Sequence, residues 1–196
     1  MTILGILGIL SGVIFLVGDW SYLKDTLGGT TKPHRVTWGM VFLLNSISFA
    51  NQYASGADNS LWMFGAVVLA TGTIFVASLK NGVGGHTKKD ILTIIISSGG
   101  AVLWLLFDRP LLSILANVFA VVVAVSPTIV KAKKDPESET RIAYLLGLIS
   151  SVLALISVGK LDYELLILPA NGAVLQIYLV YLLYFKPKRT IKQKAP

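Results

Sequence analysis

The fold is decided by the stretch Ile3-Leu-Gly-Ile-Leu-Gly-Ile-Leu-Ser-Gly-Val-Ile-Phe-Leu-Val-Gly-Asp-Trp-Ser-Tyr22, in which Asp19 is the only charged residue. An α-helix needs about 20 mostly apolar residues to cross the roughly 30 Å hydrocarbon core of a bilayer. Similar apolar runs follow at residues 36–54, 60–79, 91–107, 111–130, 142–158 and 165–185. Because a transmembrane β-strand would be about 10 residues of alternating polarity, the sequence predicts an all-α membrane protein with seven transmembrane helices.

The composition agrees with this class of protein and excludes several others. Of 196 residues, 54% are hydrophobic and 14% charged, whereas soluble domains carry about 25% charged residues. Such a hydrophobic chain is not intrinsically disordered. With no cysteine, it holds no disulfide framework and no Cys-ligated zinc or iron–sulfur centre. Both histidines, His34 and His86, fall in predicted loops, so we expect neither a metal site nor a cofactor.

The cationic side chains fall almost entirely on one side of the predicted membrane. Of the 17 lysines and arginines, only Arg109 and Lys160 lie on the other side. Cytoplasmic loops carry such an excess of positive charge, so the pattern predicts an outside N-terminus and a cytoplasmic C-terminus in a cell (plasma or inner) membrane. The net charge of +7 then indicates contact with anionic lipid headgroups, and we do not expect nucleic-acid binding.

The order of loops and helices indicates an internal repeat. The loop Lys32-Pro-His-Arg-Val-Thr-Trp38 precedes the second span much as Asp135-Pro-Glu-Ser-Glu-Thr-Arg141 precedes the sixth. Phe64-Gly-Ala-Val67 in the third span parallels Asn171-Gly-Ala-Val174 in the seventh. A second three-helix unit in the same orientation requires one extra crossing between the copies, which span 91–107 supplies. The sequence therefore predicts two parallel three-helix repeats, at 1–82 and 109–187, a linker helix within 83–108 and a basic cytoplasmic tail at 188–196.

This layout, together with Ser126-Pro-Thr-Ile-Val-Lys131 at the end of the fifth span, resembles the PQ-loop superfamily, which includes the SWEET sugar transporters. Thr128 follows Pro127 where the family usually has glutamine. The resemblance implies alternating access around a site in the middle of the membrane. It also implies that Asn171 holds a sugar hydroxyl, while Phe64 occupies the place of the second asparagine.

Uncharged amides stand near the middle of several spans, at Asn45, Asn117, Asn171 and Gln176. Polar side chains are costly in hydrocarbon and usually face the bundle interior or a wet cavity. They could instead join helices by hydrogen bonds, each contributing about 0.6 to 2 kcal/mol. We interpret them as the wall of one central cavity. With the aromatic residues Trp62 or Tyr178 nearby, that cavity would suit a neutral polar solute such as a sugar, nucleoside or vitamin.

Two further residues are candidates for gating or coupling. Asp19 is either a functional carboxylate within the membrane, for proton coupling or gating, or an aspartate at headgroup level paired with Lys24 or another loop cation. Pro127 removes a backbone hydrogen bond near the end of the fifth span, so it is either a hinge beside a gate or the end of a helix.

The sequence thus predicts a transporter of a small solute. The alternative is a non-transporting receptor or scaffold that acts through its basic cytoplasmic loops and tail. An enzyme is not expected, because no nucleophile or acid–base pair occurs at membrane depth. Whether the protein works as a monomer or a homo-oligomer is left open.

Overall fold

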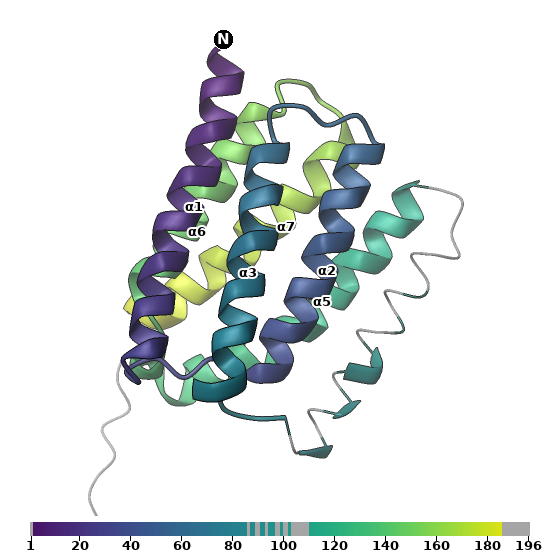
Figure 1. The fold of residues 1–196 in the computed structure, drawn as a ribbon. Helices are drawn as coiled ribbons and strands as arrows, with labels where there is room; N and C mark the ends of the chain where they lie inside the picture. The colour runs from purple at the N-terminus through teal and green to yellow at the C-terminus, as the bar shows by residue number, and fades with distance from the viewer. Residues whose placement is uncertain are drawn as a thin grey trace, which may run out of the picture.

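The computed structural model describes residues 2–85 and 110–185, with isolated positions between them at 87, 88, 91, 92, 94–96, 99 and 102. The predicted linker helix at 91–107 and the tail at 188–196 therefore lie wholly or mainly outside the described residues. The described elements are helical (Figure 1): α1 Ile3–Leu27, α2 Arg35–Ala54, α3 Leu61–Asn81, α5 Pro110–Lys134, the short 3-10 helix η1 Pro136–Ser138, α6 Arg141–Ser157, α7 Tyr163–Val180 and the π-helical turn η2 Tyr181–Phe185.

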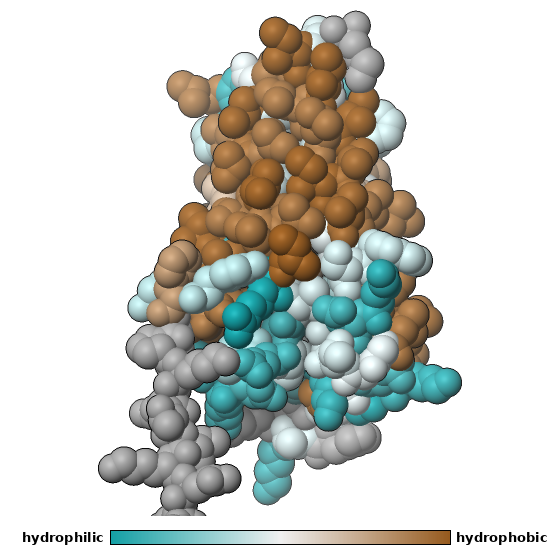
Figure 2. Space-filling model, turned by 90° about the vertical axis from the view of Figure 1, so that its left-hand side faces the viewer, coloured by the Kyte–Doolittle hydropathy of each residue, from teal (hydrophilic) through white to brown (hydrophobic). Residues whose placement is uncertain are grey.

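Within the described part of the chain, four helical segments are long and apolar enough to cross a membrane: Ile3–Leu27, Leu61–Asn81, Ile114–Lys134 and Tyr163–Phe185. Apolar side chains also cover their outer faces, since Leu69, Val76 and Val174 are 63% to 66% exposed. Figure 2 shows an apolar surface over the upper part of one flank and polar residues gathered at its lower end. By length and hydropathy, the chain is a multi-pass helical membrane protein with four candidate spans.

The helices form two groups of three that pack side by side. In the first group α3 packs against both α1 and α2, and in the second α7 packs against both α5 and α6. Between the groups, α1 packs along α6 and α2 packs along α5. The loops α1–α2 and α5–α6 both lie at the lower end of Figure 1, so the two groups run in the same direction.

Each contact between the groups contains a buried polar bond. On one side Ser150 of α6 donates its hydroxyl to the carbonyl oxygen of Ser11 in α1, at 2.7 Å. On the other side the Nδ2 of Asn117 in α5 donates to the hydroxyl of Ser48 in α2, at 2.6 Å. All four residues are at most 3% exposed. Away from water, such bonds fix the register of one helix against another.

Helix α1 lies close to two neighbours because glycines face both of them. A Cβ atom added to Gly12 would lie 2.8 Å from the carbonyl oxygen of Trp62 in α3, and one on Gly8 would lie 2.1 Å from that of Asn59. On the other side, a Cβ on Gly18 would lie 3.2 Å from the carbonyl oxygen of Ala143 in α6. Small residues let the backbones of membrane helices approach in this way.

The helices extend beyond the apolar runs that predict them. Helix α1 continues to Leu27 rather than ending at residue 22, and α5 continues to Lys134 rather than ending at residue 130. The added turns carry charged residues that the apolar run excludes, such as Lys24 and Lys133. The apolar run therefore predicts the part of each helix that lies in the apolar layer. The helix itself is longer, because backbone hydrogen bonding continues into the polar residues that follow.

Replacing Gly12 tests the close packing of α1. Gly12→Leu is expected to cost about 1 to 3 kcal/mol of stability, because the new side chain must push α1 away from α3. The measurement is the thermal unfolding midpoint of the purified protein in detergent. Val13→Leu is the matched control, since Val13 is 50% exposed on the same helix. Equal midpoints for the two variants would contradict this account of α1.

Candidate functional site

A cavity of about 150 Å³ lies between the two groups of helices. Every described long helix contributes at least one residue to its wall, among them Phe15, Asn45, Phe64, Thr128, Ser151 and Gln176. The wall combines aromatic rings, hydroxyl groups and amides. Ligand sites in proteins are commonly built from such an apolar wall with a few convergent polar groups.

Three of the four predicted amides line this cavity: Asn45 from α2, and Asn171 and Gln176 from α7. The fourth, Asn117, is 1% exposed and forms the hydrogen bond to Ser48 described above. Since Ser48 itself lines the cavity, Asn117 stands behind the wall. For Asn117, the structure supports the interpretation as an interhelical hydrogen bond.

The two predicted aromatic residues lie elsewhere. Trp62 is 60% exposed and lines an outer groove between α1 and α3. Tyr178 is 38% exposed, and the ammonium nitrogen of Lys133 lies 5.4 Å from the centre of its ring. The aromatic residues that do line the cavity are Phe15, Trp38, Phe64 and Tyr144. Helical periodicity could not select them, because these helices are apolar on nearly every face.

Several polar atoms at the cavity have no hydrogen-bond partner in the described part of the protein. They are the hydroxyl oxygens of Thr37 and Thr128 and the Oε1 of Gln176, all buried. The Gln176 side chain packs on α6 at Gly147, where an added Cβ would lie 2.6 Å from its Nε2. Buried polar groups are normally hydrogen-bonded, so these atoms mark where the polar groups of the cavity wall lack partners.

Two of the helices around the cavity contain an internal proline. Pro127 lies within α5, which continues for two turns beyond it to Lys134, whereas the predicted span ends at residue 130. The hydroxyl of Ser126 donates to the carbonyl oxygen of Val123 at 2.7 Å, the acceptor that an N–H at position 127 would have reached. Pro169 in α7, which the sequence analysis did not single out, is buried and lines the cavity.

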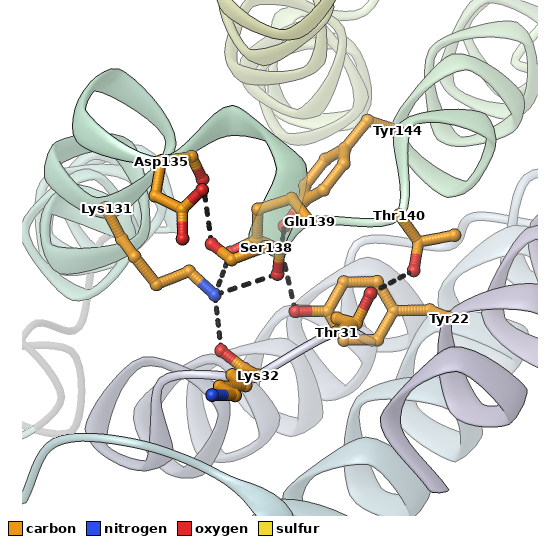
Figure 3. A network of polar contacts seen from close by, with 9 residues as sticks. All are labelled: Tyr22, Thr31, Lys32, Lys131, Asp135, Ser138, Glu139, Thr140 and Tyr144. Carbon is orange, nitrogen blue, oxygen red and sulfur yellow. Dashed lines mark hydrogen bonds and ion pairs between the residues drawn. The ribbon is translucent and has the colours of Figure 1, made fainter. Parts of the chain in front are cut away.

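A buried polar network lies at the lower end of the bundle (Figure 3). Its centre is Glu139, whose side chain is fully buried. The hydroxyl groups of Tyr22 and Tyr144 both donate to its Oε2 at 2.8 Å, and the Lys131 ammonium forms an ion pair with its Oε1 at 2.6 Å. Because Tyr144 also lines the cavity, the network adjoins the cavity directly.

The same network joins the two loops at this end. Lys131 also donates to the backbone oxygens of Lys32 and Ser138. The hydroxyl groups of Thr31 and Thr140 lie 2.7 Å apart, and Thr140 donates to a carboxylate oxygen of Asp25 at 2.7 Å. The loop α1–α2 is thereby bound to the segment between α5 and α6. Sequence analysis missed Glu139 because its partner Tyr22 is 117 residues away.

Asp19 lies on the face of α1 that meets α3. Its Oδ2 accepts a hydrogen bond from the Thr73 hydroxyl at 3.3 Å. The predicted alternative, an ion pair with Lys24 or another loop cation, does not occur among the described residues.

No known protein family, curated protein or solved structure matches this chain. What the fold establishes is a helical membrane protein with four candidate spans. Its described helices enclose a cavity lined by amide and aromatic side chains.

Replacing Glu139 tests the network at the lower end. Glu139→Gln is expected to lower the stability by about 2 kcal/mol or more, because it removes the charge that pairs with Lys131 and weakens two charge-assisted hydrogen bonds. Thermal unfolding in detergent measures the effect. Glu137→Gln is the matched control, since its 3.9 Å ion pair with Arg141 is exposed. A midpoint of Glu139→Gln within error of the control would show that the network contributes little.

Proposed function

We propose that this protein is a transporter resembling the PQ-loop and SWEET type, and that it moves a small neutral polar solute by alternating access. The observation that carries the proposal is the central cavity, lined by Asn45, Asn171 and Gln176. Uncharged amides surrounded by aromatic rings suit a solute that has hydroxyl groups and an apolar face. Neither a charged solute nor a long apolar one fits such a wall as well.

The packing of the helices supports the two-repeat architecture that this mechanism needs. In each group the third helix packs against the first two, as α3 does in one and α7 in the other. The contact of α1 with α6 has its counterpart in the contact of α5 with α2. Exchanging the two groups therefore preserves the contact pattern, as expected for parallel repeats about an axis along the membrane normal. The segments 1–82 and 109–187 would rock against each other.

The ends of the cavity differ in a way that suits two gates. At the lower end lie Glu139, Tyr144 and the bonded loops. On the side of the α2–α3 and α6–α7 loops, Phe64, Ile114 and Leu168 form a buried apolar cluster. In the proposed cycle, the gate at one end of the cavity opens while the gate at the other end stays closed. Pro127 and Pro169 provide places where α5 and α7 can bend.

The volume of the cavity limits the size of the solute. At about 150 Å³, it is smaller than typical ligand pockets of roughly 300 to 1,000 Å³. An engineered cavity of about this volume binds benzene. A solute with a single ring, such as a monosaccharide or a nucleobase-like vitamin, is therefore the best fit.

Solute flux into proteoliposomes tests the site. Asn171→Ala is expected to reduce uptake of the transported solute up to about tenfold, because the loss of one hydrogen bond costs up to about 1.5 kcal/mol. Tyr178→Phe is the matched control, since Tyr178 lies outside the cavity. Equal flux for Asn171→Ala and wild type would contradict the assignment of Asn171. No flux for any of a panel of sugars, nucleosides and vitamins would contradict transport and favour the receptor.

The receptor or scaffold alternative is favoured by one observation, the polar lower end of the molecule in Figure 2. Exposed cationic side chains at this end, such as Lys80, could bind a protein partner or anionic lipid headgroups. The cavity has no role in that alternative.

The absence of cysteine allows a clean test of orientation. Leu161 is fully exposed at the upper end, and Glu137 lies at the lower end. Two variants, Leu161→Cys and Glu137→Cys, each introduce a single cysteine. We expect a membrane-impermeant maleimide added to intact cells to label Leu161→Cys but not Glu137→Cys. Lysed cells, in which both label, provide the control. The reverse pattern in intact cells would invert the proposed topology.

A further inference from the structure

A second, smaller cavity of about 40 Å³ adjoins the central one. Four residues line both cavities: Phe15, Trp38, Tyr144 and Gln176. Asp19 lines the side cavity but not the central one. One water molecule needs about 10 to 15 Å³ measured in this way, so the side cavity has room for an ion or for a small group with a water molecule.

Asp19 is poorly satisfied by the protein around it. Its Oδ1 is buried and has no hydrogen-bond partner in the described part of the chain. Its Oδ2 accepts only from the Thr73 hydroxyl at 3.3 Å, and that hydroxyl lies closer to the carbonyl oxygen of Ala70, at 2.8 Å. A hydroxyl has one proton to donate, so Asp19 receives the weaker share of it.

The nearby donors and cations are committed elsewhere. Both Tyr22 and Tyr144 donate their hydroxyl protons to Glu139, and Lys131 pairs with the same carboxylate. Among the described lysines and arginines, none forms an ion pair with Asp19. A carboxylate in an apolar span is costly unless a positive charge or several donors compensate it.

A second acceptor without a partner among the described residues belongs to a residue of the same wall. The Oε1 of Gln176 is buried without a partner among the described residues, and Gln176 lines the side cavity. The remaining wall is largely aromatic, with the ring centres of Tyr22 and Trp38 5.0 Å apart and those of Tyr22 and Tyr144 6.2 Å apart. Aromatic rings attract cations, and oxygen atoms are the preferred ligands of hard cations.

We propose that the side cavity binds a small monovalent cationic group between the Asp19 carboxylate and the Gln176 carbonyl oxygen. This group is an alkali ion that accompanies the neutral solute. The shared lining residues allow a solute in the central cavity to contact the side cavity. Only the use of the cation in transport rests on the proposed function, because binding can be measured without flux.

The test is cation-dependent thermal unfolding of the full-length protein in detergent. Sodium, potassium, methylammonium and choline chlorides are compared at one ionic strength, and choline serves as the cation that is too large for the side cavity. We expect sodium or potassium to raise the midpoint by several degrees in a saturable way, and choline to have no effect. Stabilisation by sodium or potassium supports a bound alkali ion, and stabilisation by methylammonium but by neither alkali ion would overturn that assignment.

Variants show whether Asp19 is needed for the stabilisation by cations. Asp19→Asn is expected to abolish the stabilisation, whereas Asp58→Asn, which changes an exposed acid at the opposite end, keeps it. If Asp19→Asn does not fold, Gln176→Met decides instead, with the half-saturating cation concentration raised about threefold or more. Equal midpoints in all four salts, or an unchanged cation response in both Asp19→Asn and Gln176→Met, would overturn the proposal. Solute flux in the absence of cation binding would overturn the cation site and leave the proposed transport function intact.

Discussion

The contact between α1 and α6 is the interaction on which the rest of the structure depends. It joins the two groups of helices through Gly18 and through the bond from Ser150 to the Ser11 carbonyl oxygen. The contact of α2 with α5 joins the same two groups at a second place. The groups therefore touch along two edges and are separated at the centre. The central cavity is the space that these two contacts leave between them. Larger side chains at the contact would alter the cavity even though they do not line it.

The polar groups of the interior differ in how many hydrogen-bond and ion-pair partners each has. Glu139 has a full complement of partners in Lys131 and two tyrosines, so it is a structural charge. The amides of the central cavity are neutral and partly free. Asp19 lies between these regions with a single weak donor among the described residues. Since uncompensated polar groups are unstable in an apolar medium, their uneven distribution separates the groups that hold the bundle together from those that lack partners in the described part of the chain.

The sequence predicts much of the fold and less of the site. The apolar runs at 3–22 and 60–79 correspond to α1 and α3, because hydropathy over 20 residues reports membrane length directly. Asn45, Asn171 and Gln176 could be placed in one cavity, since an amide in an apolar helix has few other places to go. Single residues such as Trp62 and Tyr178 were misplaced, because an aromatic ring is equally acceptable to lipid and to the interior. Glu139 could not be found, because only folding brings its partners to it.

The bond from Ser126 to the Val123 carbonyl oxygen replaces a backbone hydrogen bond that α5 loses at Pro127. In an ordinary helix, bending at one point requires a backbone hydrogen bond to lengthen or break. At Pro127 the corresponding acceptor is satisfied by a side chain, and one rotation about its Cα–Cβ bond releases it. Rotamer changes of exposed side chains take picoseconds to nanoseconds, far faster than the movement of a whole helix. The Val123 carbonyl oxygen therefore depends on one exposed serine for its partner, and this bond can break and form again without disturbing the backbone hydrogen bonds of α5.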